Sequence, residues 1–265
     1  MNPPPLPKPF ETATPHWRRT LGGIWRLTYG RYLAPANLGI LAGLLGVLAL
    51  LALSGIHHGN AEHFAAWSVH FYLVFVVPVL AFLTAAGLIQ DDMKSATVDY
   101  VLTRPVRRPT FVLFRYLAHT ACIQLQCLLG LGVLLVVGVA RQVPALASMA
   151  PSLLLAQILA VTAFGALGFA LGAFTHRYLV VGIFYASIVE VGIGNIPTQL
   201  SRLSMTHHVR TIASSSWHLN ASGAGQLESV PTSIGTLLVF SFVMVAVAAG
   251  LFSLREAAGT KPKEA

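Results

Sequence analysis

Residues 91–110, DDMKSATVDYVLTRPVRRPT, form a strongly charged block with long apolar segments on both sides. Residues 91–108 contain three acidic and four basic side chains, whereas only 10% of the whole chain is charged and 55% is hydrophobic. A soluble domain carries about 25% charged residues, so this chain lacks the polar side chains needed to cover a surface that faces water. We therefore expect a polytopic membrane protein in which the block is a loop between two spans.

Outward from this loop, apolar stretches long enough to cross a membrane recur six times. A transmembrane helix needs about 20 apolar residues to cross a hydrocarbon core of ~30 Å. The stretches are Ala36–Gly55, Ala66–Ile89, Tyr116–Val139, Ser152–Phe174, Tyr178–Ile196 and Ser233–Leu254. Glu190 is the only Asp, Glu, Lys or Arg inside them. The sequence therefore predicts an all-α fold with six transmembrane helices.

The basic residues predict the orientation of these spans. Of the 17 Lys and Arg side chains, all but Arg141, Arg202 and Arg210 fall on one side of the six spans. Because cytoplasmic loops of membrane proteins are enriched in Lys and Arg, we expect both termini and residues 91–110 in the cytoplasm, and the chain in the inner (cytoplasmic) membrane. The same enrichment explains the net charge of +8 without nucleic-acid binding.

A single membrane domain, residues 16–254, is expected between a disordered proline-rich tail at 1–15 and a cytoplasmic tail at 255–265. Within residues 17–33, one helical face carries Trp17, Leu21, Ile24 and Tyr32, and Arg19 and Arg26 point the opposite way. This pattern predicts an amphipathic helix in the membrane interface. The alternative is a basic flank that only sets the topology. A long outer loop is expected at residues 197–232.

The charged block itself has the pattern of a short helix. Thr97, Val98, Val101 and Leu102 recur at helical spacing, which indicates a helix with one apolar face. Asp91 and Asp92 precede them, where a helix dipole favours anions, and the helix should end before Pro105. The next helix, from Thr110 to Val139, would be about 45 Å long and should project from the membrane. We expect loop 90–110 to be a docking surface for a soluble partner; the alternative is a solvated loop that only fixes topology.

Several enzymatic motifs are absent from the sequence. None of the four lysines follows a glycine, so the chain has no Walker A loop. It also contains no HExxH and no GxSxG. We therefore expect no catalytic residues and no cofactor. An intramembrane enzyme is correspondingly an unfavoured alternative.

The block resembles the first cytoplasmic loop of ABC-2 type permeases, the membrane subunits of one class of ATP-binding-cassette transporters. That family often shows an acid, a Gly-Thr pair, an apolar turn, an arginine–proline motif and a later base. The matching positions here are Asp92, Ala96-Thr97, Val101-Leu102, Arg104-Pro105-Val106-Arg107-Arg108 and Arg115. Ala96 departs from the usual glycine.

The resemblance covers nearly the full length of the chain, because six spans, an interfacial first helix and the segment LSRLSMTHHVRTI at 200–212 also match. It implies an exporter subunit that is not itself an enzyme, a separate cytoplasmic ATPase, a second permease chain in a homo- or heterodimer, and short re-entrant helices in the last outer loop. The ATPase would bind through Asp91, Asp92, Thr97, Val101, Leu102, Arg104, Pro105, Arg107 and Arg108.

The remaining candidates are polar side chains near the outer side. Glu190 is an ionisable group inside a span, which makes it a candidate for a role in transport. The alternatives are a structural partner for a neighbouring helix or re-entrant backbone, or a residue of an outer vestibule. With Glu190 as a proton carrier, the chain would be a secondary transporter; a non-transporting membrane anchor is another alternative. Seven histidines also fall on the outer side, but without firm metal-ligand spacing, which favours ordinary polar loop residues and leaves a metal site as the alternative. They are His57, His58, His63, His70, His207, His208 and His218.

Packing residues complete the sequence pattern. Cys122 and Cys127 point in different directions on a helix, which favours apolar packing over a disulfide. The small-xxx-small pairs Gly39/Gly43 and Gly168/Gly172 indicate close helix–helix contacts.

Overall fold

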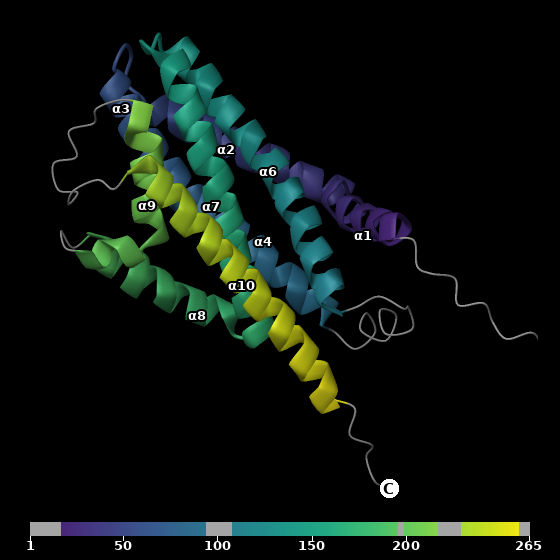
Figure 1. The fold of residues 1–265 in the computed structure, drawn as a ribbon. Helices are drawn as coiled ribbons and strands as arrows, with labels where there is room; N and C mark the ends of the chain where they lie inside the picture. The colour runs from purple at the N-terminus through teal and green to yellow at the C-terminus, as the bar shows by residue number, and fades with distance from the viewer. Residues whose placement is uncertain (1–16, 94–107, 196–198, 217–228, 260–265) are drawn as a thin grey trace, which may run out of the picture.

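The structure, a computed structural model, describes residues 17–93, 108–195, 199–216 and 229–259 (Figure 1). Every regular element within these ranges is helical, which confirms the all-α prediction. The elements are α1 (Trp17–Tyr32), α2 (Pro35–Gly55), α3 (Ala61–Trp67), η1 (Ser68–Val76), α4 (Val77–Asp92), α6 (Arg108–Ala140), α7 (Leu146–Phe174), α8 (Tyr178–Tyr185), η2 (Ala186–Gly192), η3 (Ile193–Asn195), η4 (Gln199–Leu203), α9 (Met205–Ala213), η5 (Ser214–Ser216) and α10 (Val230–Gly259).

Five helices in the described part of the chain are long and apolar enough to cross a membrane. They are Pro35–Gly55, Ala61–Asp92, Pro109–Ala140, Leu146–Phe174 and Val230–Leu254. The sixth expected span begins with eight residues of α8 and seven of η2, which rise only about 22 Å against a core of ~30 Å. The multi-pass helical character is therefore confirmed, whereas the sixth span and the orientation stay predictions.

The second span, Ala61–Asp92, is continuous but not uniformly α-helical. Its middle, η1, is a π-helix, and Pro78 follows it in the first turn of α4. Proline has no N–H and its ring crowds the carbonyl four residues earlier, and a wider turn at this point relieves both problems. The span can thus cross the bundle without a break.

Helix α7 lies at the centre of the bundle, against α4, α6, α9 and α10 (Figure 1). Its contact with α4 depends on Gly168 and Gly172. A methyl group at Gly168 would overlap with the carbonyl of Phe82, and one at Gly172 would overlap with Ile89 and Ala86. These two glycines therefore act as predicted. Gly39 and Gly43 have open space around them instead.

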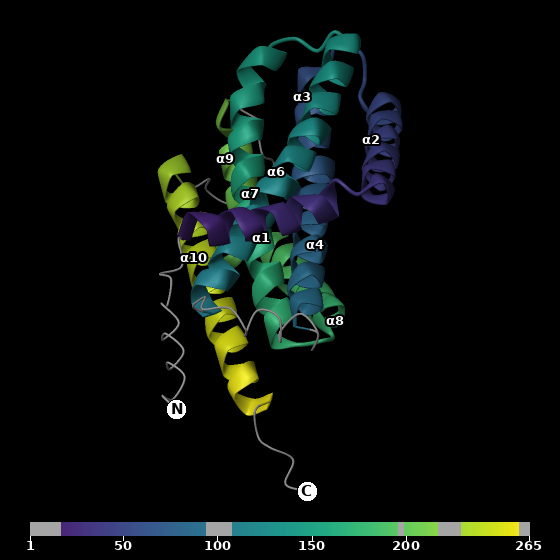
Figure 2. The same ribbon diagram turned by 90° about the vertical axis from the view of Figure 1, so that its right-hand side faces the viewer.

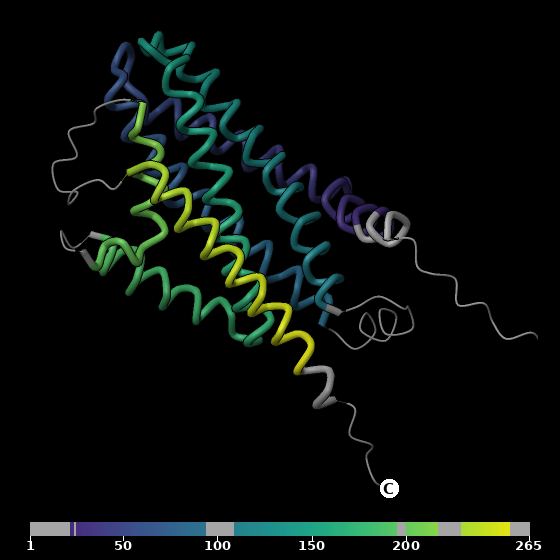
Figure 3. The backbone as a smooth tube through the Cα atoms, viewed as in Figure 1, coloured from purple at the N-terminus to yellow at the C-terminus, as the bar shows by residue number. Residues whose placement is uncertain are grey.

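Helix α1 lies across α6 and α4 rather than along them (Figure 2). A helix over Trp17–Tyr32 confirms the predicted element, while its position in a membrane interface stays a prediction. At one end of the bundle, α4 ends, α6 begins and α7 is followed by α8 (Figure 3). The candidate functional site lies at the ends of these helices.

Candidate functional site

The charged block is only partly within the described residues. Asp91 and Asp92 form the last turn of α4, and Arg108 is the first residue of α6. The other candidates, Thr97, Val101, Leu102, Arg104, Pro105 and Arg107, lie outside the described residues, as does the short helix expected there. The structure therefore shows how the two ends of the block are held.

Asp92 and Arg115 form a buried, two-pronged ion pair between α4 and α6. Arg115 Nε donates to Asp92 Oδ2 at 2.7 Å, and Arg115 Nη2 donates to Asp92 Oδ1 at 2.8 Å. The side chains are only 6% (Asp92) and 7% (Arg115) exposed. Two parallel hydrogen bonds fix the mutual orientation of both groups as well as their distance. The helices on either side of residues 94–107 are thus clamped together.

The third helix at this place is α1, which binds Arg115 of the clamp and Asp91 beside it. Arg115 Nη1 donates to Thr28 Oγ1 at 2.8 Å, and Thr28 is fully buried. Arg31 Nη2 donates to Asp91 Oδ2 at 2.6 Å in a partly exposed pair. We call the set Thr28, Arg31, Tyr32, Asp91, Asp92, Arg115 and His119 the polar joint. It connects α1, α4 and α6.

Tyr32 completes the polar joint one turn further into the bundle. Its hydroxyl lies 2.6 Å from Nδ1 of His119 on α6. Burial raises the pKa of the Tyr32 hydroxyl well above its usual value, so the group keeps its proton and can donate it to this hydrogen bond. The end of α1 is therefore held to α6 at two levels, by Thr28 and by Tyr32.

A separate contact joins α4 to the end of α7. The Gln90 amide nitrogen donates to the carbonyl oxygen of Gly172 and to that of Thr175, the latter at 2.9 Å, and its Oε1 lies 2.8 Å from Nδ1 of His176. These are the last carbonyls of α7, which have no partner within their own helix. A displacement of the α4 end would consequently reach α1, α6 and α7 together.

Glu190 lies 7% exposed in η2, and its carboxylate caps the start of α9. It accepts hydrogen bonds from the backbone N–H groups of Met205 at 3.2 Å and Thr206 at 2.9 Å. It also accepts from the hydroxyls of Ser204 at 2.7 Å and Tyr185 at 2.9 Å. The first N–H groups of a helix lack internal partners and attract anions. This geometry favours the alternative named above, a structural partner for a neighbouring helix.

The cysteines and outer histidines noted in the sequence do not belong to the polar joint. Cys122 and Cys127 are both buried and free, as expected of packing residues. Nδ1 of His57 lies 3.1 Å from Nδ1 of His63 near the α2–α3 connection. Within the described ranges, which exclude His218, no group of three or more His, Cys, Asp or Glu side chains could hold a metal ion.

Three residues of the site were not singled out from the sequence. Thr28, Gln90 and His119 become important only through contacts with residues 85 to 87 positions away, and a sequence pattern does not reveal such contacts. His119 gave one usable signal, because a polar ring inside an expected span needs a partner.

Comparison with known proteins adds one finding. A family model described as "ABC-2 family transporter protein" matches residues 22–257, which is most of the chain and includes every residue of the polar joint and Glu190. No curated protein is similar enough to this sequence to count as a match.

Proposed function

Because the chain belongs to the ABC-2 family of transporter proteins, we propose that it is the membrane subunit of an exporter whose ATP is hydrolysed by a separate cytoplasmic subunit. Membrane subunits of this family are permease components and are not enzymes themselves. The energy for transport must then enter through a contact between the two subunits. The polar joint is the observation that supports a place for this contact.

The proposed contact is the loop of residues 91–108. Its docking residues are Asp91, Thr97, Val101, Leu102, Arg104, Pro105, Arg107 and Arg108. Asp92, which the sequence also suggested, is buried, so it would act through its ion pair with Arg115 rather than by direct contact. Support comes from both ends of the loop, because the Asp92–Arg115 clamp joins α4 to α6 and Thr28 adds α1. A force on the loop would act on α1, α4 and α6 together, because hydrogen bonds join these three helices there.

The proposed topology has six spans, with both termini in the cytoplasm of a cell that holds the chain in its inner membrane. The distribution of Lys and Arg supports this orientation, because all but three of the 17 lie on the side of residues 91–110. Helix α8 supports a sixth crossing, since its side chains are apolar and none of them is buried against the described part of the chain. A second permease chain, identical or related, would complete the pathway.

The main rival is a secondary transporter in which Glu190 carries the proton. The capping geometry counts against it. Two of the four donors to the carboxylate are backbone N–H groups, which can only donate. Protonation of Glu190 would replace one accepting oxygen with a donor and leave a helix terminus short of an acceptor.

The experiment is co-purification of the ATP-binding subunit with this chain from membranes. Reversing the charge of the loop with Arg104→Glu and Arg107→Glu should release that subunit while the chain stays inserted. The matched control makes the same charge change in the C-terminal tail, with Lys261→Glu and Lys263→Glu, and should retain it. Equal retention by both variants would contradict docking at residues 91–108.

A further inference from the structure

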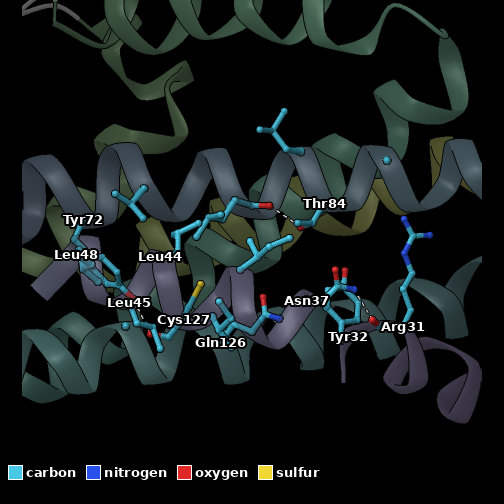
Figure 4. A pocket seen from close by; sticks show the side chains of 17 residues that line it. Arg31, Tyr32, Asn37, Leu44, Leu45, Leu48, Tyr72, Thr84, Gln126 and Cys127 are labelled. Atoms are coloured by element: carbon cyan, nitrogen blue, oxygen red, sulfur yellow. Dashed lines mark hydrogen bonds between the residues drawn. The ribbon is translucent and has the colours of Figure 1, made fainter. Parts of the chain in front are cut away.

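A groove of about 290 Å³ separates the first half of α2 from η1 and α4, and α6 also contributes to its wall (Figure 4). Its sides are mainly aliphatic, including Leu41, Leu44 and Leu45 of α2 and Leu80 and Leu83 of α4. Within α2, only Leu48 and Ala52 are buried, and both lie in its second half. The first half of α2 is therefore held away from α4 by a space that the described part of the chain leaves empty.

The dimensions of the groove match a slender, unbranched molecule. Between Asn37 and Leu48, which both line it, α2 rises about 17 Å. Half of a hydrocarbon core is about 15 Å, which is the depth that an acyl chain of one leaflet reaches. A helix with its side chains is about 10 Å wide, and a groove of about 290 Å³ is too small to hold one along this length.

The two ends of the groove differ in polarity. The end at α1 holds Arg31, Asn37 and Thr84, and the deep end is closed by Tyr72, Cys127 and Leu48. The Tyr72 hydroxyl is fixed in place, because it lies 2.6 Å from the Cys127 carbonyl oxygen, to which it donates, and 2.9 Å from Gln157 Oε1. Arg31 donates one hydrogen bond to Asp91 from Nη2, and a guanidinium has five N–H donors. Arg31 at the mouth of an apolar slot, with N–H donors beyond the one that binds Asp91, fits an amphiphile whose head is a strong hydrogen-bond acceptor such as a phosphate.

We propose that the groove binds one phospholipid, with an acyl chain between α2 and α4 and its phosphate beside Arg31. The bound lipid supports the first half of α2 against the bundle and lies directly beside the polar joint. This proposal rests on α2 and α4 being membrane spans, and it does not depend on ATP-driven transport.

The test uses vesicles of phosphatidylethanolamine and phosphatidylglycerol that contain a phosphatidylglycerol with a diazirine on one acyl chain. After irradiation of the full-length chain, adducts are mapped by mass spectrometry. We expect adducts on Leu45 and Leu80 inside the groove to exceed those on Leu129, which is 48% exposed on α6 and outside it. Equal labelling of these positions would show ordinary boundary lipid and overturn the proposal.

Substitutions separate the groove from the rest of α2. Leu44→Trp fills the slot and should reduce labelling of Leu80 about tenfold, the effect of losing about two buried methylene contacts. Val47→Trp adds the same side chain three residues away at a position that does not line the groove, and labelling should stay at the wild-type level. Leu80→Phe fills the slot from α4 and serves as a second variant if Leu44→Trp is poorly folded. Equal labelling in the filled and control variants would contradict the assignment.

The head group is tested separately with Arg31→Gln. This variant should lose labelling by the phosphatidylglycerol probe and keep labelling by a diazirine-bearing diacylglycerol, which has no phosphate. Unchanged labelling by both probes would remove Arg31 from the site. A disulfide between two copies of a Leu44→Cys variant, in place of lipid adducts, would instead show that a second chain occupies the groove.

Discussion

The buried clamp between Asp92 and Arg115 makes a quantitative prediction about stability. Asp92→Asn keeps the shape of the side chain but leaves a guanidinium that is 7% exposed without its counter-charge. Removing one partner of a buried ion pair costs about 3–5 kcal/mol. For a chain of this size, each kcal/mol lowers Tm by roughly 2–4 °C, so Tm should fall by about 10 °C.

Asp91 provides a matched control one residue away. Its pair with Arg31 is exposed, with side-chain exposures of 46% for Arg31 and 38% for Asp91. Exposed ion pairs contribute about 0–1 kcal/mol, so Asp91→Asn should lower Tm by no more than about 4 °C. The same chemical change is therefore expected to have very different effects at adjacent positions.

The assay is thermal unfolding of the purified chain, followed with a dye that becomes fluorescent on reaction with thiols. Cys122 and Cys127 are both 3% exposed, so they react only when the bundle opens. The double variant Asp92→Asn with Arg115→Gln should recover much of the loss, because no unpaired charge stays buried. Equal losses in Asp91→Asn and Asp92→Asn, or additive losses in the double variant, would refute this reasoning.

Three further predictions concern other parts of the fold. Glu190→Gln should weaken the α9 cap by about 1–3 kcal/mol, seen as faster hydrogen exchange at residues 205–213 with α1 unchanged; unchanged exchange would contradict the cap. In a background without Cys122 and Cys127, cysteines at positions 95 and 258 should be labelled from the cytoplasm and those at 60 and 215 from outside; labelling of 95 and 215 from the same side would exclude six spans. Gly172→Ala should destabilise by about 1–3 kcal/mol through overlap with Ala86 and Ile89, whereas Gly39→Ala has open space and should not; equal Tm values would rule out the close α4–α7 contact.

Much of the fold could be predicted because membrane helices follow local rules. Five of the six apolar stretches are long helices, since hydrocarbon demands a continuous run of apolar side chains that is visible in the sequence. The stretch from Tyr178 differs, because its helix changes to a π-helix at Ala186 and then to a tight turn that brings Glu190 to α9. A hydropathy profile does not show where an α-helix changes to a π-helix or a tight turn.

The site was predicted less completely than the fold. The charged block identified Asp92 and the later base Arg115, but their pairing joins residues on separate helices. Thr28 and His119 enter the site because α1 lies across the bundle, and the crossing depends on packing that spacing does not reveal. The charge of Glu190 made it a candidate in the sequence. Its carboxylate caps α9 by binding backbone N–H groups, which every sequence contains, so the sequence does not predict this contact.

The central claim is that this chain takes its energy from a separate ATP-binding subunit. The most direct measurement is the rate of ATP hydrolysis by that co-expressed subunit in vesicles with and without the wild-type chain. Our account predicts that the chain changes this rate and that Arg104→Glu with Arg107→Glu abolishes the change, whatever the proton gradient. An identical hydrolysis rate with and without the chain would contradict it.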